Sequence, residues 1–176
     1  MRVVLIWAQD KNGVIGDGKR LLWRVPEDLK HFQHLTTGNT VIIGRRTWES
    51  LPKPLPNRLN LVITRNPDFK ATGGMVVGSL SEALKIAENE GYETAYVIGG
   101  AQIYRQSIEI ADELVVTYLN LDVRDARNDV GARGLVYAPK IDSQIWTIDE
   151  NRSQACFQPK SGDAEYKTVT FVRKWR

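Results

Sequence analysis

Short apolar runs rich in branched residues alternate with helical segments along most of this chain, and this alternation constrains its fold more than any other feature. The runs that we expect to form strands are 3–8, 40–43, 59–64, 75–77, 95–98 and 114–119. Between them, helical patterns cover 27–35, 47–51, 81–89 and 101–107. Strands that alternate with helices predict βαβ units, in which a parallel sheet carries helices.

The last part of the chain, residues 145–173, has no helical periodicity. Alternating side chains at 167–173 and turn-forming residues at 159–163 predict an antiparallel hairpin there. We therefore expect an α/β fold with a mostly parallel sheet, a C-terminal antiparallel hairpin and helices on both faces. The 176 residues suit a single domain spanning 1–176. The polar, turn-rich segment 122–139 is expected to be a long, mobile connection.

Composition and charge exclude several classes of protein. The single cysteine, Cys156, excludes a disulfide framework, and we expect it to be at least half-buried. His31 and His34 have no third ligand candidate nearby, so no metal site is expected. The longest apolar run is too short to cross a bilayer, which predicts a cytoplasmic protein without a membrane partner. The net charge of +3 is spread along the chain, which argues against a nucleic-acid partner.

Asp28 is the most informative residue of the sequence. Pro26 suits the first position of a helix, and Asp28, Phe32 and Leu35 then share one apolar face. We expect the remaining sides of this helix to carry its other charged and histidine residues, namely Glu27, Lys30, His31 and His34. No base is therefore expected beside Asp28 on its own face. Asp28 could simply complement the helix dipole. A carboxylate on an apolar face is costly without a partner or a task, however, so we favour a ligand-facing acid.

Two glycine-containing turns indicate an anion site. The sequences 44–47 and 99–102 each follow an expected strand and precede an expected helix, where backbone N–H groups are free to bind an anion. Glycine is also common in ordinary turns, so each turn alone is weak evidence. Two of them in one small sheet suit a pyrophosphate, and Thr64 with Arg65 ends another strand and could hold a further phosphate.

Arg58 follows the stiff segment Pro54-Leu55-Pro56-Asn57. A guanidinium fixed on such a turn suits bidentate binding of a carboxylate. An ordinary surface arginine is an equally good interpretation of this segment by itself. Trp23, taken alone, indicates a core position more than a site.

Six segments together resemble bacterial dihydrofolate reductases. They are Leu5-Ile6-Trp7-Ala8-Gln9, Val14-Ile15-Gly16, Trp23-Arg24-Val25-Pro26-Glu27-Asp28, Gly44-Arg45-Arg46-Thr47-Trp48-Glu49-Ser50-Leu51, Pro54-Leu55-Pro56-Asn57-Arg58 and Val97-Ile98-Gly99-Gly100-Ala101-Gln102-Ile103-Tyr104. The resemblance covers nearly the whole chain. It implies an eight-stranded sheet, NADPH-dependent reduction of 7,8-dihydrofolate to tetrahydrofolate for one-carbon metabolism, and a monomer that binds trimethoprim and methotrexate.

The resemblance also implies roles for individual residues. Asp28 would hold the pteridine and support its protonation with Trp23 at the catalytic site, while Thr117 would hydrogen-bond Asp28 and Arg58 would bind the glutamate α-carboxylate. The walls of the substrate pocket would be Ile6, Ala8, Leu29, Phe32, Leu55 and Ile98. The cofactor would contact Ala8, Val14, Ile15, Gly16, Gly18, Arg45, Arg46, Thr47, Thr64, Arg65, Ser79, Gly99, Gly100, Ala101, Gln102, Ile103 and Tyr104.

The resemblance further implies that the loop 13–23 closes over the nicotinamide. Arg45, Thr64 and Arg65 would lie near the adenosine 2′-phosphate. A cis peptide would join Gly99 and Gly100. Three positions depart from the usual pattern, namely Leu22, Asn57 and Ala101, and the segment 122–139 is unusually long. The alternatives are a related pyrimidine reductase of riboflavin synthesis, which would not need Asp28 together with Arg58, and a non-catalytic nucleotide-binding protein, which would not need Asp28.

Overall fold

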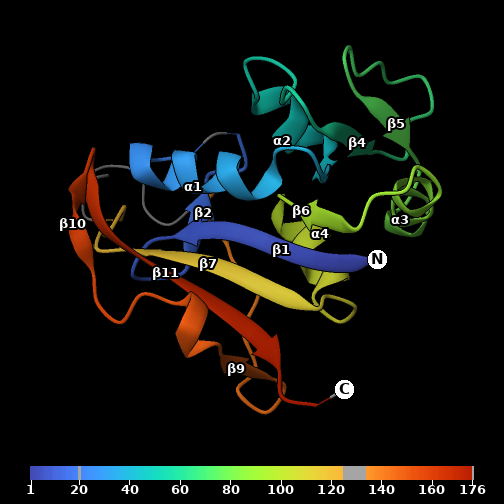
Figure 1. Ribbon diagram of the computed structural model, residues 1–176. Coiled ribbons are helices and arrows are strands. Elements are labelled where there is room, and N and C mark those ends of the chain that lie inside the picture. The colour runs from blue at the N-terminus through green and yellow to red at the C-terminus, as the bar shows by residue number, and fades with distance from the viewer. Residues whose placement is uncertain (20, 125–133, 176) are drawn as a thin grey trace.

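The computed structural model describes residues 1–19, 21–124 and 134–175, and its elements alternate as the sequence predicts (Figure 1). The helices are α1 (Pro26–Thr36), α2 (Arg45–Ser50), α3 (Leu80–Asn89) and α4 (Ala101–Ser107), with a short 3-10 helix at Glu150–Arg152. The strands are β1 (Arg2–Gln9), β2 (Val14–Gly16), β3 (Thr40–Gly44), β4 (Leu59–Ile63), β5 (Met75–Val77), β6 (Thr94–Val97), β7 (Glu113–Leu119), β8 (Val136–Tyr137), β9 (Trp146–Ile148), β10 (Gln158–Ser161) and β11 (Ala164–Arg173).

The central sheet is mostly parallel. Its order is β10-β11-β7-β1-β6-β3-β4-β5, in which the six strands from β7 to β5 are parallel and β11 runs against β7. The eight strands of this order match the expected number, and β9 adds a ninth by pairing with β11. A separate two-stranded ribbon, β2 with β8, lies outside this sheet.

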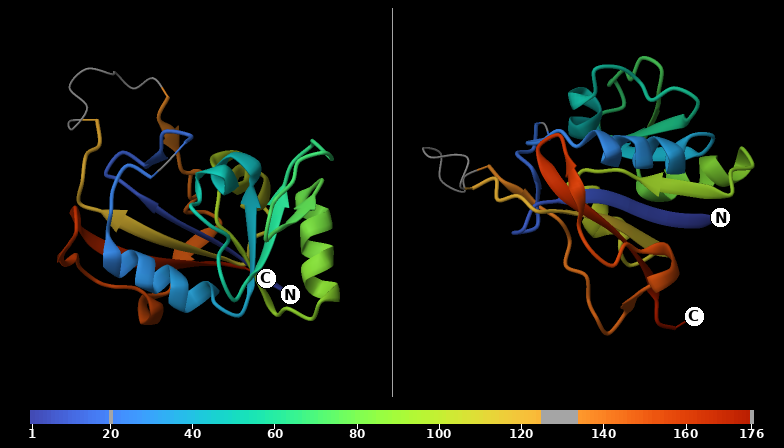
Figure 2. Two further views of the ribbon diagram at one scale, coloured as in Figure 1. Left: turned by 90° about the horizontal axis from the view of Figure 1, so that it is seen from above. Right: turned by 60° about the vertical axis from the view of Figure 1, so that its left-hand side comes forward.

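Alternate side chains of the central strands point to opposite faces, and helices cover both faces as predicted (Figures 1 and 2). On one face, Phe32 and Leu35 of α1 pack against Val4, Ile6 and Val115 of the sheet. On the other face, α3 and α4 pack against a larger cluster that includes the following buried strand residues: Leu5, Trp7, Ile42, Leu61, Val97 and Val116. The carboxyl ends of the parallel strands are left for a site.

Some predicted boundaries need correction. The turn expected at 159–163 is shorter, because Pro159 and Lys160 lie in β10 and only Gly162 and Asp163 turn the chain. A proline is tolerated in β10 because it is an edge strand. Cys156 is exposed, contrary to the expectation of a buried thiol. Half of the expected mobile connection 122–139, residues 125–133, lies outside the described residues, and β8 forms part of the other half.

The α3 helix begins with a partial capping box. The Ser79 hydroxyl oxygen accepts the Glu82 backbone N–H at 3.1 Å, as the Ser-x-x-Glu pattern indicates. The Glu82 carboxylate, however, accepts the backbone N–H of Gly78 at 2.6 Å. The serine half of the capping box therefore forms, and the glutamate instead satisfies the backbone N–H of the residue that precedes the cap.

The tip of the β10–β11 hairpin lies against the start of α1 (Figure 2). The backbone N–H of Arg24 donates to the Asp163 carboxylate at 2.7 Å, and the N–H of Asp163 donates to the Arg24 carbonyl at 2.9 Å. The Ser161 hydroxyl accepts the Glu27 N–H at 3.1 Å. Since Val25, the N-cap residue, provides no side-chain cap, the hairpin satisfies a free donor of α1 from a distant part of the chain.

Gly162 should therefore be intolerant of a side chain. Its φ is +59°, and an added Cβ would overlap the Arg24 carbonyl oxygen. We expect Gly162→Ala to lower the free energy of unfolding by about 2–4 kcal/mol, from the left-handed backbone and the overlap together. Gly91→Ala is the control, because Gly91 has φ +82° with nothing within 4 Å of an added Cβ, and should cost only about 1–2 kcal/mol. Urea denaturation measures both, and equal losses would contradict the tight fit.

Candidate active site

The site lies where β1 and β7 end beside α1. Asp28, in the first turn of α1, accepts a hydrogen bond of 2.6 Å from the Thr117 hydroxyl on β7. Thr117 is paired with Ala8 on β1 and with Thr168 on β11, whose hydroxyl lies 3.4 Å from that of Thr117. The carboxylate is thus held against the end of the sheet by a buried hydroxyl.

The burial of Asp28 perturbs its ionisation. Removal from water raises the pKa of Asp28, while the Thr117 hydrogen bond and the charge of His31 lower it, with burial as the larger effect. The expectation that no base lies near Asp28 is wrong. His31 follows Asp28 by one helical turn and is half-buried; its pKa is lowered by burial and raised by Asp28.

The expected substrate-pocket residues converge only in part. Ile6, Phe32, Leu55 and Ile98 belong to a single apolar cluster beside α1, as the resemblance implies. Ala8 and Trp23 belong to a neighbouring cluster around Val25, Leu119 and Ala164. The Leu29 side chain is 47% exposed and packs in neither cluster.

Arg58 is oriented by its own turn. Its Nε donates to the Pro56 carbonyl at 2.8 Å, and one Nη donates to the Thr36 hydroxyl at 3.1 Å. Its guanidinium also lies 6.0 Å from the centre of the Phe32 ring, and partial burial lowers its pKa. These contacts place a cation on the same side of the sheet as Asp28, beside the apolar cluster.

Asn60 was missed by the sequence analysis and shapes this turn. It is buried in β4, and its amide binds the backbone N–H and carbonyl of Leu55 at 3.1 and 2.9 Å and the Arg58 carbonyl at 3.0 Å. Asn57, where glycine is usual, adopts φ +58°. Asparagine tolerates this left-handed conformation better than most residues, so the departure preserves the turn.

The two glycine-containing turns lie side by side, as the neighbouring positions of β3 and β6 require. The Gly44 N–H donates to the Gly99 carbonyl at 2.8 Å, and a cis peptide joins Gly99 to Gly100. A Cβ on Gly100 would lie 2.9 Å from the Thr47 hydroxyl, so only glycine fits there without displacement of Thr47. Such a backbone surface is suited to the close approach of a phosphate group.

The remaining residues expected to bind the cofactor differ in their position and exposure. Arg45, Thr64 and Ser79 follow the neighbouring strands β3, β4 and β5. Together with Arg46 and Arg65 they therefore lie at the carboxyl ends of these strands, at one edge of the sheet. Arg45 also pairs with Glu49 at 3.4 Å. Ala101, Ile103 and Tyr104 are buried, whereas Gln102 is exposed.

Tyr104 has a structural contact that the sequence did not predict. Its hydroxyl donates to the Ile6 carbonyl at 2.7 Å, its ring lies 5.4 Å from that of Trp7, and burial raises the pKa of its phenol. The side chain therefore fixes α4 against β1. This contact positions the second glycine turn, which immediately precedes α4, relative to Ala8 at the end of β1.

Asp10 is the second residue that the sequence analysis missed. It is 1% exposed, and its carboxylate accepts the N–H groups of Asn12 and Val14 at 2.8 Å each and that of Val123 at 3.1 Å. An aspartate that precedes a glycine-containing turn is the one signal that could have indicated it. The carboxylate fixes the beginning of the loop 13–23, whose residues Val14–Gly16 pair with β8.

No group of three or more metal-ligating side chains occurs in the part of the chain that the structure describes. Among the same residues, no helix combines the length and the apolar character needed to span a membrane.

Comparison with known proteins gives a consistent result. The family described as dihydrofolate reductase matches residues 2–173. A curated dihydrofolate reductase from Neisseria meningitidis is 41% identical over 174 residues, which cover 98% of this chain and 99% of that protein. A curated dihydrofolate reductase from Mycobacterium tuberculosis is 48% identical over 122 residues, which cover 68% of this chain and 72% of that protein. A solved dihydrofolate reductase from Enterococcus faecalis, complexed with NADP(H) and RAB-propyl, has a TM-score of 0.82 at 31% identity and covers 99% of this chain and 97% of its own.

Burial of Asp28 should make stability depend on pH. In the unfolded chain this carboxyl titrates near 3.8, and in the folded chain its pKa is higher. Below pH 3.8 the Asp28 carboxyl is protonated in both the folded and the unfolded chain, so burial carries no ionisation cost. As pH rises from there through the folded pKa, the unfolded state ionises first and native stability falls. Asp28→Asn, whose amide oxygen can still accept the Thr117 hydroxyl, should be increasingly more stable than the parent across this window.

Urea denaturation from pH 3.5 to 8 would measure this difference. Asp68→Asn serves as control, because Asp68 is exposed and the same charge is removed without a buried site. A difference between Asp28→Asn and the parent that is equally large at the lowest pH would show that burial of the charge is not its cause.

Proposed function

Because the chain belongs to the dihydrofolate reductase family and reduces 7,8-dihydrofolate to tetrahydrofolate with NADPH, we propose that Asp28 is the acid that serves this reaction. Reduction of the substrate's C=N bond adds a hydride to carbon and a proton to nitrogen, and bound NADPH supplies the hydride. The proton needs another source. The observation that carries the proposal is the largely buried Asp28–Thr117 pair at the end of the parallel sheet.

Asp28 would bind the amidine-like edge of the pteridine and support protonation of its ring nitrogen N5. The raised pKa of Asp28 favours a carboxyl that holds a proton closer to neutral pH than an exposed aspartate does. Thr117 would keep the carboxyl in one orientation. Ile6, Phe32 and Ile98 would exclude water from the flat ring, and Trp23 and Ala8 would border the reacting end.

Arg58 would bind the α-carboxylate of the glutamate tail. Its bonds to Pro56 and Thr36 hold the guanidinium in place before the substrate arrives, which reduces the entropy lost on binding. Leu29, Leu55 and Phe32 would contact the part of the substrate that joins the pteridine to this tail. Antifolates of the methotrexate type share the carboxylate, whereas trimethoprim does not.

The paired glycine turns would hold the cofactor's pyrophosphate. Gly99, Gly100, Ala101 and Gln102 offer backbone N–H groups, and Arg46 and Thr47 lie on the facing turn. The group at one sheet edge, formed by Arg45, Thr64, Arg65 and Ser79, would bind the adenosine 2′-phosphate. Val14, Ile15, Gly16 and Gly18 would cover the nicotinamide as the loop 13–23 closes.

The product tetrahydrofolate carries one-carbon units, so the enzyme serves one-carbon metabolism. A single domain over residues 1–176 and a cytoplasmic monomer stay predictions. Gel filtration coupled to light scattering would test the oligomeric state directly.

Asp28→Asn should abolish most dihydrofolate reduction and leave NADPH affinity nearly unchanged. Loss of a group that supports proton transfer typically lowers the rate by about 10²–10⁴-fold. Activity of the parent should fall as pH rises through the raised pKa of Asp28. Thr117→Val removes a hydrogen bond that lowers this pKa, so the falling limb should move to higher pH. Stopped-flow hydride transfer and NADPH titration measure these effects; a turnover within a few-fold of the parent would refute the role of Asp28.

Arg58→Leu should weaken dihydrofolate and methotrexate by roughly 2–4 kcal/mol and leave trimethoprim nearly unaffected, as expected for loss of a desolvated charge pair. Thr36→Val is the matched control: it retains the cation and removes a contact that orients it. Its effect on methotrexate should be smaller than that of Arg58→Leu. Calorimetric titrations measure the affinities, and equal weakening of both inhibitors would indicate a fold defect in place of carboxylate recognition.

The double variant Arg45→Gln, Arg65→Gln should raise the KM for NADPH and barely change that for NADH. The cofactors differ by one phosphate, and two charge-assisted contacts of about 1.5–3 kcal/mol each would give a preference on the order of 10²–10⁴-fold. Glu49→Gln is the control, since it removes the partner of Arg45 and should leave the preference for NADPH intact. An unchanged cofactor ratio in the double variant would move the phosphate site to Thr64 and Ser79.

A further inference from the structure

A second hollow lies on the opposite face of the sheet from Asp28. Gln9 and Tyr118 are the register pair that follows Ala8 and Thr117 on β1 and β7, so their side chains point to the other face. Together with Asn12, Tyr137, Lys140 and Ile141 they line a pocket of about 400 Å³, named here the β1–β7 pocket. This volume falls within the range of small-molecule sites.

The polar groups of the β1–β7 pocket are hydrogen-bond donors with unused capacity. The Gln9 side-chain oxygen accepts the Trp7 indole N–H at 2.9 Å, and its Nε2 has no hydrogen bond to any described residue. The Asn12 oxygen accepts from Arg124, which leaves the buried Asn12 Nδ2 without a partner among the described residues. A buried amide that lacks an acceptor is unfavourable, so an acceptor supplied by a ligand would relieve it.

Other residues add two phenols and a cation. Burial raises the pKa of Tyr118, which keeps its hydroxyl a donor, and Tyr137 provides a second phenol. Lys140 is exposed at the rim. Among the described residues that line the pocket, none is acidic, while the tyrosine rings and Ile141 supply flat, apolar walls.

We propose that the β1–β7 pocket binds a small aromatic carboxylate. The aromatic body would lie between Tyr118, Tyr137 and Ile141, and the carboxylate would accept from the Gln9 and Asn12 amides with Lys140 nearby. Charged acceptors form the stronger hydrogen bonds with such donors. The pocket adjoins the ribbon of β2 and β8, where the Ala138 N–H donates to the Gly13 carbonyl at 2.8 Å.

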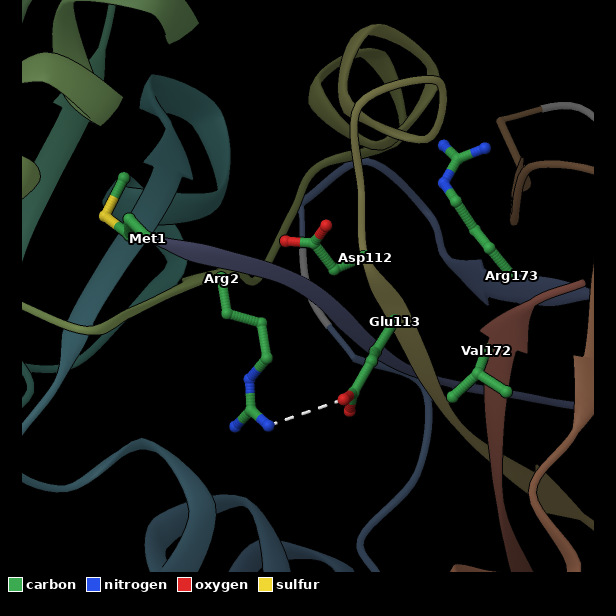
Figure 3. A pocket seen from close by; sticks show the side chains of 6 residues that line it. All are labelled: Met1, Arg2, Asp112, Glu113, Val172 and Arg173. Carbon is green, nitrogen blue, oxygen red and sulfur yellow. Dashed lines mark hydrogen bonds and ion pairs between the residues drawn. The ribbon is translucent and has the colours of Figure 1, made fainter. Parts of the chain in front are cut away.

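A larger hollow of about 460 Å³, at the amino ends of β1 and β7, has no buried side-chain donor without a partner among the described residues that line it (Figure 3). Arg2 pairs with Glu113 at 3.4 Å, and Asp112 accepts the Val3 N–H at 2.6 Å. Arg173 points away from the Arg2–Glu113 pair and donates to three backbone carbonyls. The charged side chains that line this hollow already bind one another or the backbone, so it carries no ligand proposal.

The test is a titration of 2-naphthoate into the ¹⁵N-labelled enzyme saturated with NADPH and trimethoprim, which fill the two sites of the reaction. We expect saturable amide shifts centred on Gln9, Gly13, Tyr118 and Ala138. The neutral 2-naphthamide should bind at least five-fold more weakly. Shifts confined to the surroundings of Arg58 or Arg173, or no saturable shifts, would overturn the proposal.

Gln9→Glu is the decisive variant. It retains the oxygen that accepts the Trp7 indole N–H and replaces the amide donor by a carboxylate, so naphthoate affinity should fall at least ten-fold. Lys140→Gln should weaken binding by about two- to five-fold, and Lys85→Gln, the same change on exposed α3, should not. If Gln9→Glu does not fold, Tyr118→Phe removes one donor and should weaken binding a few-fold. Unchanged affinity in the folded pocket variants would contradict the assignment.

Discussion

The burial of one carboxylate at the end of a parallel sheet organises the active site. Asp28 lies in a largely desolvated position, where its charge is costly, and a single hydroxyl from Thr117 partly compensates that cost. Each neighbouring element holds this pair in register. β7 places Thr117 between β1 and β11, and α1 brings Asp28 over the strand ends. Movement of any of these elements would either hydrate the carboxylate or separate it from its donor.

The same parallel arrangement brings together the residues that we propose for cofactor binding. The strands β6 and β3 are neighbours, so the turns that follow them meet even though about fifty residues of sequence separate them. The Gly44 N–H donates to the Gly99 carbonyl at that point, and Gly100 has no room for a side chain beside Thr47. The positions of Asp28 and of the two glycine turns are therefore consequences of one strand order, with β1 between them.

Much of this architecture could be predicted from the sequence because it is recorded in local patterns. The alternation of strands and helices, the apolar face of α1 and the glycine turns are all visible within short windows. The segments quoted for the dihydrofolate reductase resemblance contain Asp28 and Arg58, and Thr117 entered through the same resemblance. Asn57 departs from the usual glycine, yet the left-handed backbone persists. The pattern of residue types was thus sufficient for the fold, and it supplied the principal residues of the proposed site.

What could not be predicted depends on contacts between distant segments. The brief strands β2 and β8 have too few residues to show alternation, and the pairing between them joins segments about 120 residues apart. The Asp10 carboxylate accepts the Val123 N–H. The Asn60 amide binds Leu55 in the turn that precedes β4, and His31 lies close enough to Asp28 to change its pKa. Ser161 and Asp163 complete the start of α1 although more than 130 residues separate them from it. No local window contains both partners of the Asp10–Val123 and hairpin contacts, whereas the contacts of Asn60 and His31 are local and depend on how their side chains are directed in the fold.

The hairpin contact has a consequence for the order in which the enzyme is made. The ribosome synthesises α1 well before the Ser161–Asp163 tip that satisfies its first turn, because more than 130 residues lie between them. The central strand β7, which carries Thr117, can pair along its second edge only after β11 has been synthesised. A nascent chain therefore has its glycine turns long before its acid is fixed in place. We therefore expect Asp28 and Thr117 to take up their paired arrangement only after the hairpin has been synthesised.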